Sequence, residues 1–204
     1  MAVIKFTNSK GSLKKIINYI TQDEKTDEKL ISGQNCMPES AFDEMTTVKN
    51  LYGKNNGRQY IHIVQSFKPD EKLKYETAHK IGLKLAEYFK DYQIIIATHK
   101  DRDHVHNHLV LNSVSMKDGR KFQQSAEDMQ RFKEFSDKLC KDFGLSVIEK
   151  NKQESIYNKN EYQAAVKGKS YKFKLINAID KSMENSSNKA EFIDNMKRYG
   201  YDVA

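Results

Sequence analysis

The 204-residue sequence lacks a membrane-spanning segment, a signal peptide and a pattern of cysteines that would form disulfides. No apolar run approaches the roughly 20 residues that a membrane-spanning helix needs. The opening residues, 1–7, are too few and too polar for a signal peptide. Only two cysteines occur, Cys36 and Cys140, with no Cys-x-x-Cys spacing, which argues against a disulfide framework and a cysteine zinc site. These absences predict a cytoplasmic protein without a membrane segment.

Positive charge is concentrated in one part of the chain. The formal net charge is +7, and residues 150–181 hold eight lysines against three acidic residues. A basic block suits a polyanionic partner because phosphate contacts release counterions. Aromatic residues interleave with these lysines, which suits stacking on the bases of a single strand. A solvated lysine-rich loop and ordinary packing of the terminal helices are the alternatives.

Hydrophobic periodicity predicts alternating strands and helices. We expect strands over 2–6, 30–36, 59–67, 92–98 and 104–114, and helices over 13–20, 38–51, 69–90, 125–143, 171–185 and 189–198. Ser9 and Ser12 are both candidates to cap the first helix. This order predicts an α+β (α/β layered) fold, with a central, mostly antiparallel sheet flanked by helices and further helices at the C-terminal end. Residues 200–203 look like the start of another strand, so we expect a fragment of a longer protein.

Histidines form the most unusual pattern in the sequence. Four of the six lie between His99 and His108. In a strand, residues two apart share a face, so His104, His106 and His108 would point the same way. The preceding strand would bring His99 opposite His104 if the connection has four residues, or opposite His106 if it has six. Both arrangements place His99 on the same face as the alternating histidines.

Three neutral imidazoles on one face predict a metal site with open coordination positions, which is typical of a catalytic metal. Imidazole binds Zn, Mn, Co, Ni and Fe, so the pattern does not name the ion. Asp101 and Asp103 lie between the strands, where they could orient imidazole N–H groups or hold a proton. The alternative is a histidine-rich surface strand that binds no metal.

Three segments, in order, resemble the motifs of the MOBP-type relaxases, the mobilisation nucleases of plasmids and integrative elements within the His-hydrophobe-His endonuclease superfamily. The segment 99–108 reads His-x-Asp-x-x-His-x-His-Asn-His and is followed by an apolar run and Asn-Ser-Val, as in the third motif. The segment 16–20, Ile-Ile-Asn-Tyr-Ile, resembles the first motif, and His62-x-x-x-Ser66-Phe67 resembles the second. Residues 33–36, Gly-Gln-Asn-Cys, are similar to a segment of members from Gram-positive elements. The resemblance covers residues 1–150 and, more weakly, 171–203.

The resemblance implies a role for each matching residue. Tyr19 would be the nucleophile, and Asp101 and a metal-bound water are the candidates for the general base. The implied ligands of a divalent ion (Mn, Mg or Zn) are His99, His106 and His108, with His104 as a further candidate. His104 is a candidate ligand because His104 and His106 are the pair separated by a hydrophobic residue. The pair His106 and His108 is separated by Asn107, which is polar. His62 and Ser66 would hold DNA near the cleavage site.

The implied function is strand-specific nicking and rejoining of single-stranded DNA at an origin of transfer, through a covalent 5′-phosphotyrosine. Residues 1–150 would form the catalytic domain, and 151–204 a basic linker with DNA-clamping helices. The expected DNA-binding residues of that region are Lys167, Lys169, Tyr171, Lys172 and Lys174. Implied partners are relaxosome accessory proteins and the coupling protein of a secretion system, and the protein could enter the recipient cell with the DNA. The alternatives are a metal-dependent nuclease that activates water and a non-enzymatic basic DNA-binding module.

Overall fold

A computed structural model describes residues 2–69, 71, 73–101, 104–147, 171–186 and 188–203. The chain divides into two compact units, Met1–Glu149 and Lys150–Ala204. In the first unit the strands are β1 (Ala2–Ser9), β2 (Ile31–Gln34), β3 (Tyr60–Phe67), β4 (Ile94–His99) and β5 (His106–Asn112). The α-helices are α1 (Leu13–Ile20), α2 (Ala41–Leu51), α3 (Tyr75–Ala86) and α4 (Ala126–Asp142), with 3₁₀ helices η1 (Glu28–Leu30) and η2 (Glu87–Phe89).

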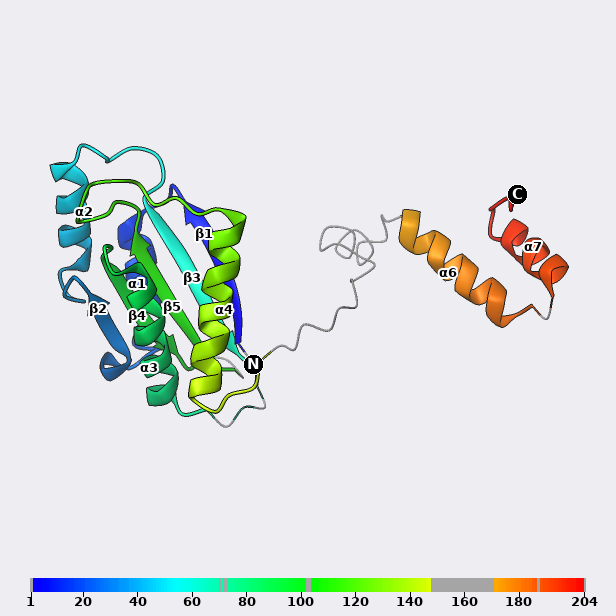
Figure 1. The fold of residues 1–204 in the computed structure, drawn as a ribbon, viewed down its shortest axis with the longest axis horizontal. Helices are drawn as coiled ribbons and strands as arrows, with labels where there is room; N and C mark the ends of the chain where they lie inside the picture. The colour runs from blue at the N-terminus through cyan, green and yellow to red at the C-terminus, as the bar shows by residue number, and fades with distance from the viewer. Residues whose placement is uncertain are drawn as a thin grey trace. The chain divides into compact units, whose positions relative to one another are not determined.

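The five strands form one sheet in the order β1-β3-β5-β4-β2, and every neighbouring pair is antiparallel (Figure 1). Helices α3 and α4 cross one face of this sheet, and α1 lies on the other (Figure 1). The α+β prediction is therefore confirmed, and the sheet is wholly antiparallel in the part of the chain that the structure describes. β4 and β5, which carry the histidines, lie near its middle.

Each face of the sheet has its own hydrophobic core. Under α3 and α4, strand residues such as Ile61, Ile96 and Leu109 pack with Phe132. Under α1 and α2, the alternate residues of the same strands pack with the helices, and Val110 and Ile17 belong to this second core. Because side chains alternate along a strand, the residues between the core positions of one face belong to the other.

Helix α1 forms where the periodicity predicts it. The side chain of Ser12 accepts a hydrogen bond from the Lys15 amide, so Ser12 caps the helix and Ser9 does not. Leu13, Ile17 and Ile20 are buried at helical spacing against the sheet. Tyr19 lies off that stripe and keeps 38% of its surface exposed.

Behind the histidines, on the α3 side, a buried polar network crosses the sheet. Thr98 Oγ1 donates to Asn107 Oδ1 (2.7 Å), and Asn107 Nδ2 donates to Gln65 Oε1 (2.9 Å) and to the Ala78 carbonyl (2.8 Å). His79 Nδ1 lies 2.9 Å from Thr98 Oγ1 and extends the network towards Ser32. Thr98 and Asn107 are directly paired in the β4–β5 ladder. The network therefore links β3, β4, β5 and α3 at the level of the histidines.

Several predicted boundaries were wrong. Helix α3 begins at Tyr75 rather than residue 69, because Lys74 is extended (ψ 144°) and Leu73 packs on the core before the helix starts. Helix α2 begins at Ala41, after a turn over 38–40. Residues 201–203 form no strand, because the described residues offer them no strand partner.

The second unit contains α6 (Tyr171–Glu184) and α7 (Lys189–Arg198), as the periodicity predicts. Asn188 caps α7 by accepting from the Glu191 amide. Asn195 Nδ2 donates to the Asn185 carbonyl and the Ser186 hydroxyl, and this ties α7 to the residues that follow α6. Among the described residues, no helix combines the length and the apolar character needed to cross a membrane.

Replacing Asn107 with Leu should lower the free energy of unfolding by about 2–4 kcal/mol, because Gln65, Thr98 and the Ala78 carbonyl would lose a partner inside the core. Urea unfolding measures this. The control is Asn8→Ala, which removes one exposed hydrogen bond from Arg58 and should cost less than about 0.5 kcal/mol. Equal effects of the two variants would show that the network does not stabilise the sheet.

Candidate active site

The β4–β5 hairpin determines which histidines face each other. His99 pairs with His106, and His108 pairs with Ala97, so the connection spans the six residues 100–105. The four-residue alternative, with His99 opposite His104, is wrong. The amide of Lys100 donates to the Lys25 carbonyl, and the carbonyl of Val105 accepts from Phe67, so these groups bond outside the β4–β5 ladder. His104 consequently lies in the connection and not in β5, where the sequence placed it.

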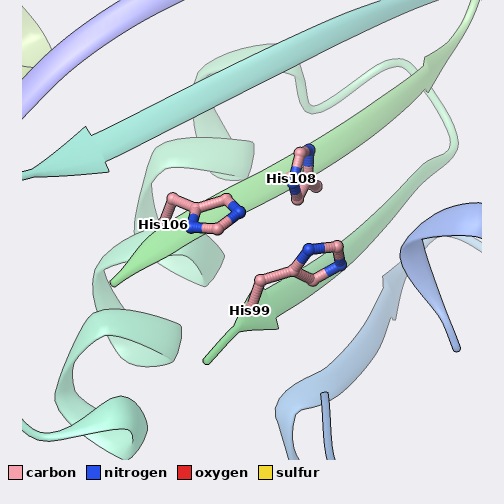
Figure 2. Close-up of side chains that lie close together, drawn as sticks. All are labelled: His99, His106 and His108. Carbon is pink, nitrogen blue, oxygen red and sulfur yellow. The ribbon is translucent and has the colours of Figure 1, made fainter. Parts of the chain in front are cut away.

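His99, His106 and His108 converge on one shared space on the α1 side of the sheet (Figure 2). All three are buried, and their ring centroids lie 4.2–5.1 Å apart. One ring nitrogen from each lies within 4.8 Å of the others. This is the arrangement that the alternating pattern predicted for three metal-binding imidazoles.

Hydrogen bonds on the outer side of the rings determine which nitrogens face the shared space. His99 Nε2 lies 2.9 Å from the Ile20 carbonyl, and His106 Nδ1 lies 3.2 Å from the His104 carbonyl. A carbonyl only accepts, so these nitrogens carry the protons. The other nitrogens, His99 Nδ1 and His106 Nε2, lie 3.9 and 3.8 Å from the same oxygen of Asp101. Backbone carbonyls orient metal-binding histidines in this way in many proteins.

His62 contacts His108 directly. Its Nε2 lies 2.7 Å from His108 Nδ1, and the two rings stack with centroids 4.9 Å apart. Burial lowers the pKa of His62 to about 4, with smaller contributions from the neighbouring His99 and Lys5. His62 is therefore neutral near pH 7 and able to accept the Nδ1–H of His108. This contact is placed to orient His108, and the DNA contact that the sequence predicts for His62 stays a prediction.

The residues present fit a divalent transition metal. His99 Nδ1 is buried and has no hydrogen-bond partner among the described residues, although burial of a polar nitrogen without a partner is costly. Burial also lowers the pKa of His99, which keeps its ring neutral and able to bind a cation. Neutral imidazoles with oriented outer N–H groups are the donors that such ions prefer.

Tyr19 stands beside this cluster. Its ring centroid lies 6.2 Å from that of His99 and 6.1 Å from that of His108. A cleft of about 340 Å³ opens next to the tyrosine. The residues that line it are Val3, Lys5, Tyr19, Val64, Ser66, His104, His106 and His108.

The structure thus brings together most residues that the sequence singled out. Ser66 lies directly opposite His106 across β3 and β5, and the ring of His104 lies 5.4 Å from that of His106. Asp101 faces both His99 and His106, whereas Asp103 lies outside the described residues.

The residues predicted to bind DNA in the C-terminal region belong to the second unit. Tyr171 begins α6 and is 69% exposed, Lys172 and Lys174 lie in the same helix, and Lys174 is exposed. Lys167 and Lys169 lie outside the described residues.

Sequence reasoning missed Lys5 and Lys25. Lys5 lies on β1 opposite Val64, so strand alternation could have placed it on the histidine face. Lys25 lies in the loop after α1, with its ammonium nitrogen 3.5 Å from the centroid of the Tyr19 ring. Its position depends on loop contacts that have no periodic signal in the sequence.

Comparison with known proteins places the chain among relaxases. Residues 19–145 match the family model "Relaxase: MobA/VirD2-like, nuclease domain". Two Staphylococcus aureus proteins named rlx are 38% and 34% identical over the whole chain, which spans 62% and 64% of their lengths. The group II intron-interrupted relaxase LtrB of Lactococcus lactis is 32% identical over 68% of the chain and 27% of its own length. The chain therefore covers less than two thirds of these relatives.

The fold is also similar to a solved structure. The Mn-bound crystal structure of the MobM relaxase domain (MOBV; Mob_Pre) with plasmid pMV158 oriT DNA matches 80% of this chain and 98% of its own, with a TM-score of 0.53. The two sequences are 12% identical, so this likeness concerns the fold alone.

Alanine in place of His99, His106 or His108 should weaken Mn²⁺ binding about a hundredfold or more, because each variant removes one ligand nitrogen. Isothermal titration calorimetry measures the affinity. His104→Ala is the matched control, since it keeps the backbone carbonyl that orients His106 and should change the affinity less than about threefold. A loss of affinity in His104→Ala as large as that in His99→Ala would place His104 among the ligands.

His62→Ala should weaken Mn²⁺ binding roughly 10–100-fold while all three ligands remain, because His108 would lose the partner of its Nδ1. His62→Gln, which can still accept a hydrogen bond, should recover part of that affinity. Full affinity in His62→Ala, measured by the same calorimetry, would show that the contact does not orient His108.

Proposed function

This chain belongs to the MobA/VirD2-like relaxases, and on that premise we propose that it nicks and rejoins one DNA strand at an origin of transfer through a covalent bond to Tyr19. The observation that carries the proposal is a partly exposed tyrosine beside three buried histidines, at a cleft open to a substrate. The MobM relaxase domain, whose fold is similar, is bound to plasmid oriT DNA in its crystal structure, which supports the choice of substrate.

The proposed reaction is a transesterification. The Tyr19 hydroxyl oxygen forms a bond to the phosphorus of the scissile phosphodiester, and the bond from phosphorus to the 3′-oxygen breaks. The electron pair of that bond stays on the 3′-oxygen, which ends as a free 3′-hydroxyl, while the 5′-phosphate stays on Tyr19. The phenolic proton balances the one that the 3′-oxygen gains. Because the phosphodiester energy is kept in the phosphotyrosine, the reverse reaction rejoins the strand.

A divalent cation bound by His99, His106 and His108 would supply a Lewis acid that polarises and orients the phosphate. The Mn-bound MobM structure makes Mn²⁺ the first ion to test, with Mg²⁺ and Zn²⁺ as alternatives. We propose Asp101 as the proton acceptor, since its carboxylate faces two of the rings and its side chain is 25% exposed towards solvent.

DNA would enter the cleft over the β1–β3 edge of the histidine face. Ser66 and Lys5 line this cleft and offer a hydroxyl and a positive charge to the backbone of a single strand. We propose residues 1–150 as the catalytic domain and 151–204 as a basic region that clamps DNA through Lys167, Lys169, Tyr171, Lys172 and Lys174. Relaxosome accessory proteins and a secretion coupling protein are the proposed partners, and the cytoplasm is the proposed location.

Two other functions would use parts of the same site. A nuclease that activates water would need the histidines but not Tyr19. A DNA-binding module would need the basic surface and neither group. The position of Tyr19 beside His99 and His108 favours the relaxase reaction over both.

Tyr19→Phe should abolish a denaturation-resistant protein–DNA adduct, because the variant lacks the oxygen that forms the bond. The measurement is gel electrophoresis after incubation with labelled single-stranded origin DNA and Mn²⁺. The control is Tyr75→Phe, which changes a similarly exposed tyrosine (40%) on α3, across the sheet from the cluster, and should keep the adduct.

The outcomes separate the three functions. Nicking at the wild-type rate by Tyr19→Phe would favour activated water. DNA binding with neither nicking nor adduct in Mn²⁺, Mg²⁺ or Zn²⁺ would favour a binding module.

A further inference from the structure

We propose that Lys25 is a further active-site residue, whose ammonium group stabilises the negative charge that develops on Tyr19 as it attacks the phosphate. This inference rests on the proposed relaxase reaction and adds to it the one lysine that the described residues place over the tyrosine ring. The Lys25 ammonium nitrogen lies 3.5 Å from the ring centroid. That is well inside the range of about 6 Å over which a cation and an aromatic face attract each other.

The loop that carries Lys25 is attached to the strand that carries His99. The Lys25 carbonyl accepts from the Lys100 amide (2.8 Å), one residue beyond His99. The buried Thr26 hydroxyl donates to the Thr98 carbonyl (2.7 Å), one residue before it. The side chains of Lys100 and Asp27 form an ion pair. These three contacts hold the Lys25 backbone at a defined distance from the histidine cluster.

The end of α1, which carries Tyr19, is also hydrogen-bonded to His99. The carbonyl of the next residue, Ile20, accepts from His99 Nε2 at 2.9 Å. The helix end that carries the tyrosine and the loop that carries the lysine therefore both bond to β4 within one residue of His99. These bonds to β4 fix the position of the Lys25 backbone relative to Tyr19, so the lysine side chain starts close to the tyrosine ring.

The Lys25 ammonium group is placed to interact with charge on the Tyr19 ring. The lysine side chain is half-buried, so water screens it less than a fully exposed lysine. A phenol that loses its proton spreads negative charge into its ring. An ammonium group already over that ring interacts more strongly with the transition state than with the neutral tyrosine, which is the condition for faster chemistry.

A lysine at this position could instead bind a DNA phosphate. Such a contact would strengthen DNA binding in the ground state and leave the rate at saturating DNA unchanged. The two roles therefore differ in whether the rate or the affinity depends on Lys25. The contact with the aromatic face favours the role at the tyrosine.

The experiment compares wild type, Lys25→Met and Lys25→Arg in single-turnover adduct formation, with saturating single-stranded origin-of-transfer DNA and Mn²⁺. We expect Lys25→Met to react roughly 10–100-fold more slowly, because it keeps the length of the chain and loses the charge. Lys25→Arg should recover most of the rate. The dissociation constant for DNA, the Mn²⁺ affinity and the melting temperature should stay close to those of wild type.

The matched control is Lys14→Met. Lys14 lies on α1 with its ammonium nitrogen 5.7 Å from the centroid of Phe42, so this variant removes a lysine from another aromatic face and leaves Tyr19 unchanged. Its rate of adduct formation should equal that of wild type. Equal slowing by Lys14→Met and Lys25→Met would indicate a general effect of charge and overturn the specific role of Lys25.

Two further results would overturn the inference in distinguishable ways. Unchanged adduct formation in Lys25→Met, or a defect that disappears at saturating DNA, would remove the role of Lys25 and leave the relaxase function intact. A wild-type chain that forms no adduct in any of the three metals would overturn the proposed function and this inference with it.

Discussion

The pairing of β4 with β5 is the constraint on which the site depends. It sets His99 opposite His106 and His108 one step further along. A slip of one residue in either strand would turn its histidines to the opposite face, because side chains alternate along a strand. The buried bond between Thr98 and Asn107, extended to Gln65, lies behind the histidines and opposes such a slip. These buried polar residues therefore specify the register of β4 against β5 more strictly than aliphatic packing alone would.

The same strand positions the proposed nucleophile. His99 uses one nitrogen to bond the Ile20 carbonyl and keeps the other for the shared space of the three rings. One side chain thus connects the proposed metal centre to the helix end that carries Tyr19. Contacts of Thr26 and Lys100 attach the following loop to the same region. The proposed attack of Tyr19 on phosphorus would need such precise placement, because the reacting atoms must be aligned.

Much of the fold was readable from local patterns. The spacing of apolar residues in 13–20 predicted α1 with its observed bounds. Ser125 predicted the start of α4, and its side chain caps that helix. Boundaries failed where tertiary contacts decide them, as at Leu73, which packs on the core before α3 begins. Alternation predicted the shared face of His106 and His108, but it left open whether His99 faces His104 or His106. The residue roles in the reaction stay predictions.

The sequence alone determined which chemical groups are present and which of them share a face of a strand or helix. It could do so because the side-chain repeats of two residues in a strand and 3.6 in a helix are local patterns. It determined that histidines alternate, that Tyr19 lies on a short amphipathic helix, and that the motifs follow the order of relaxases. Only the tertiary structure decided the length of the hairpin connection, the contact of His62 with His108, and the position of Lys25 over Tyr19. Each of these depends on segments far apart in the chain, whose distances are set by packing and hydrogen bonds and not by local spacing.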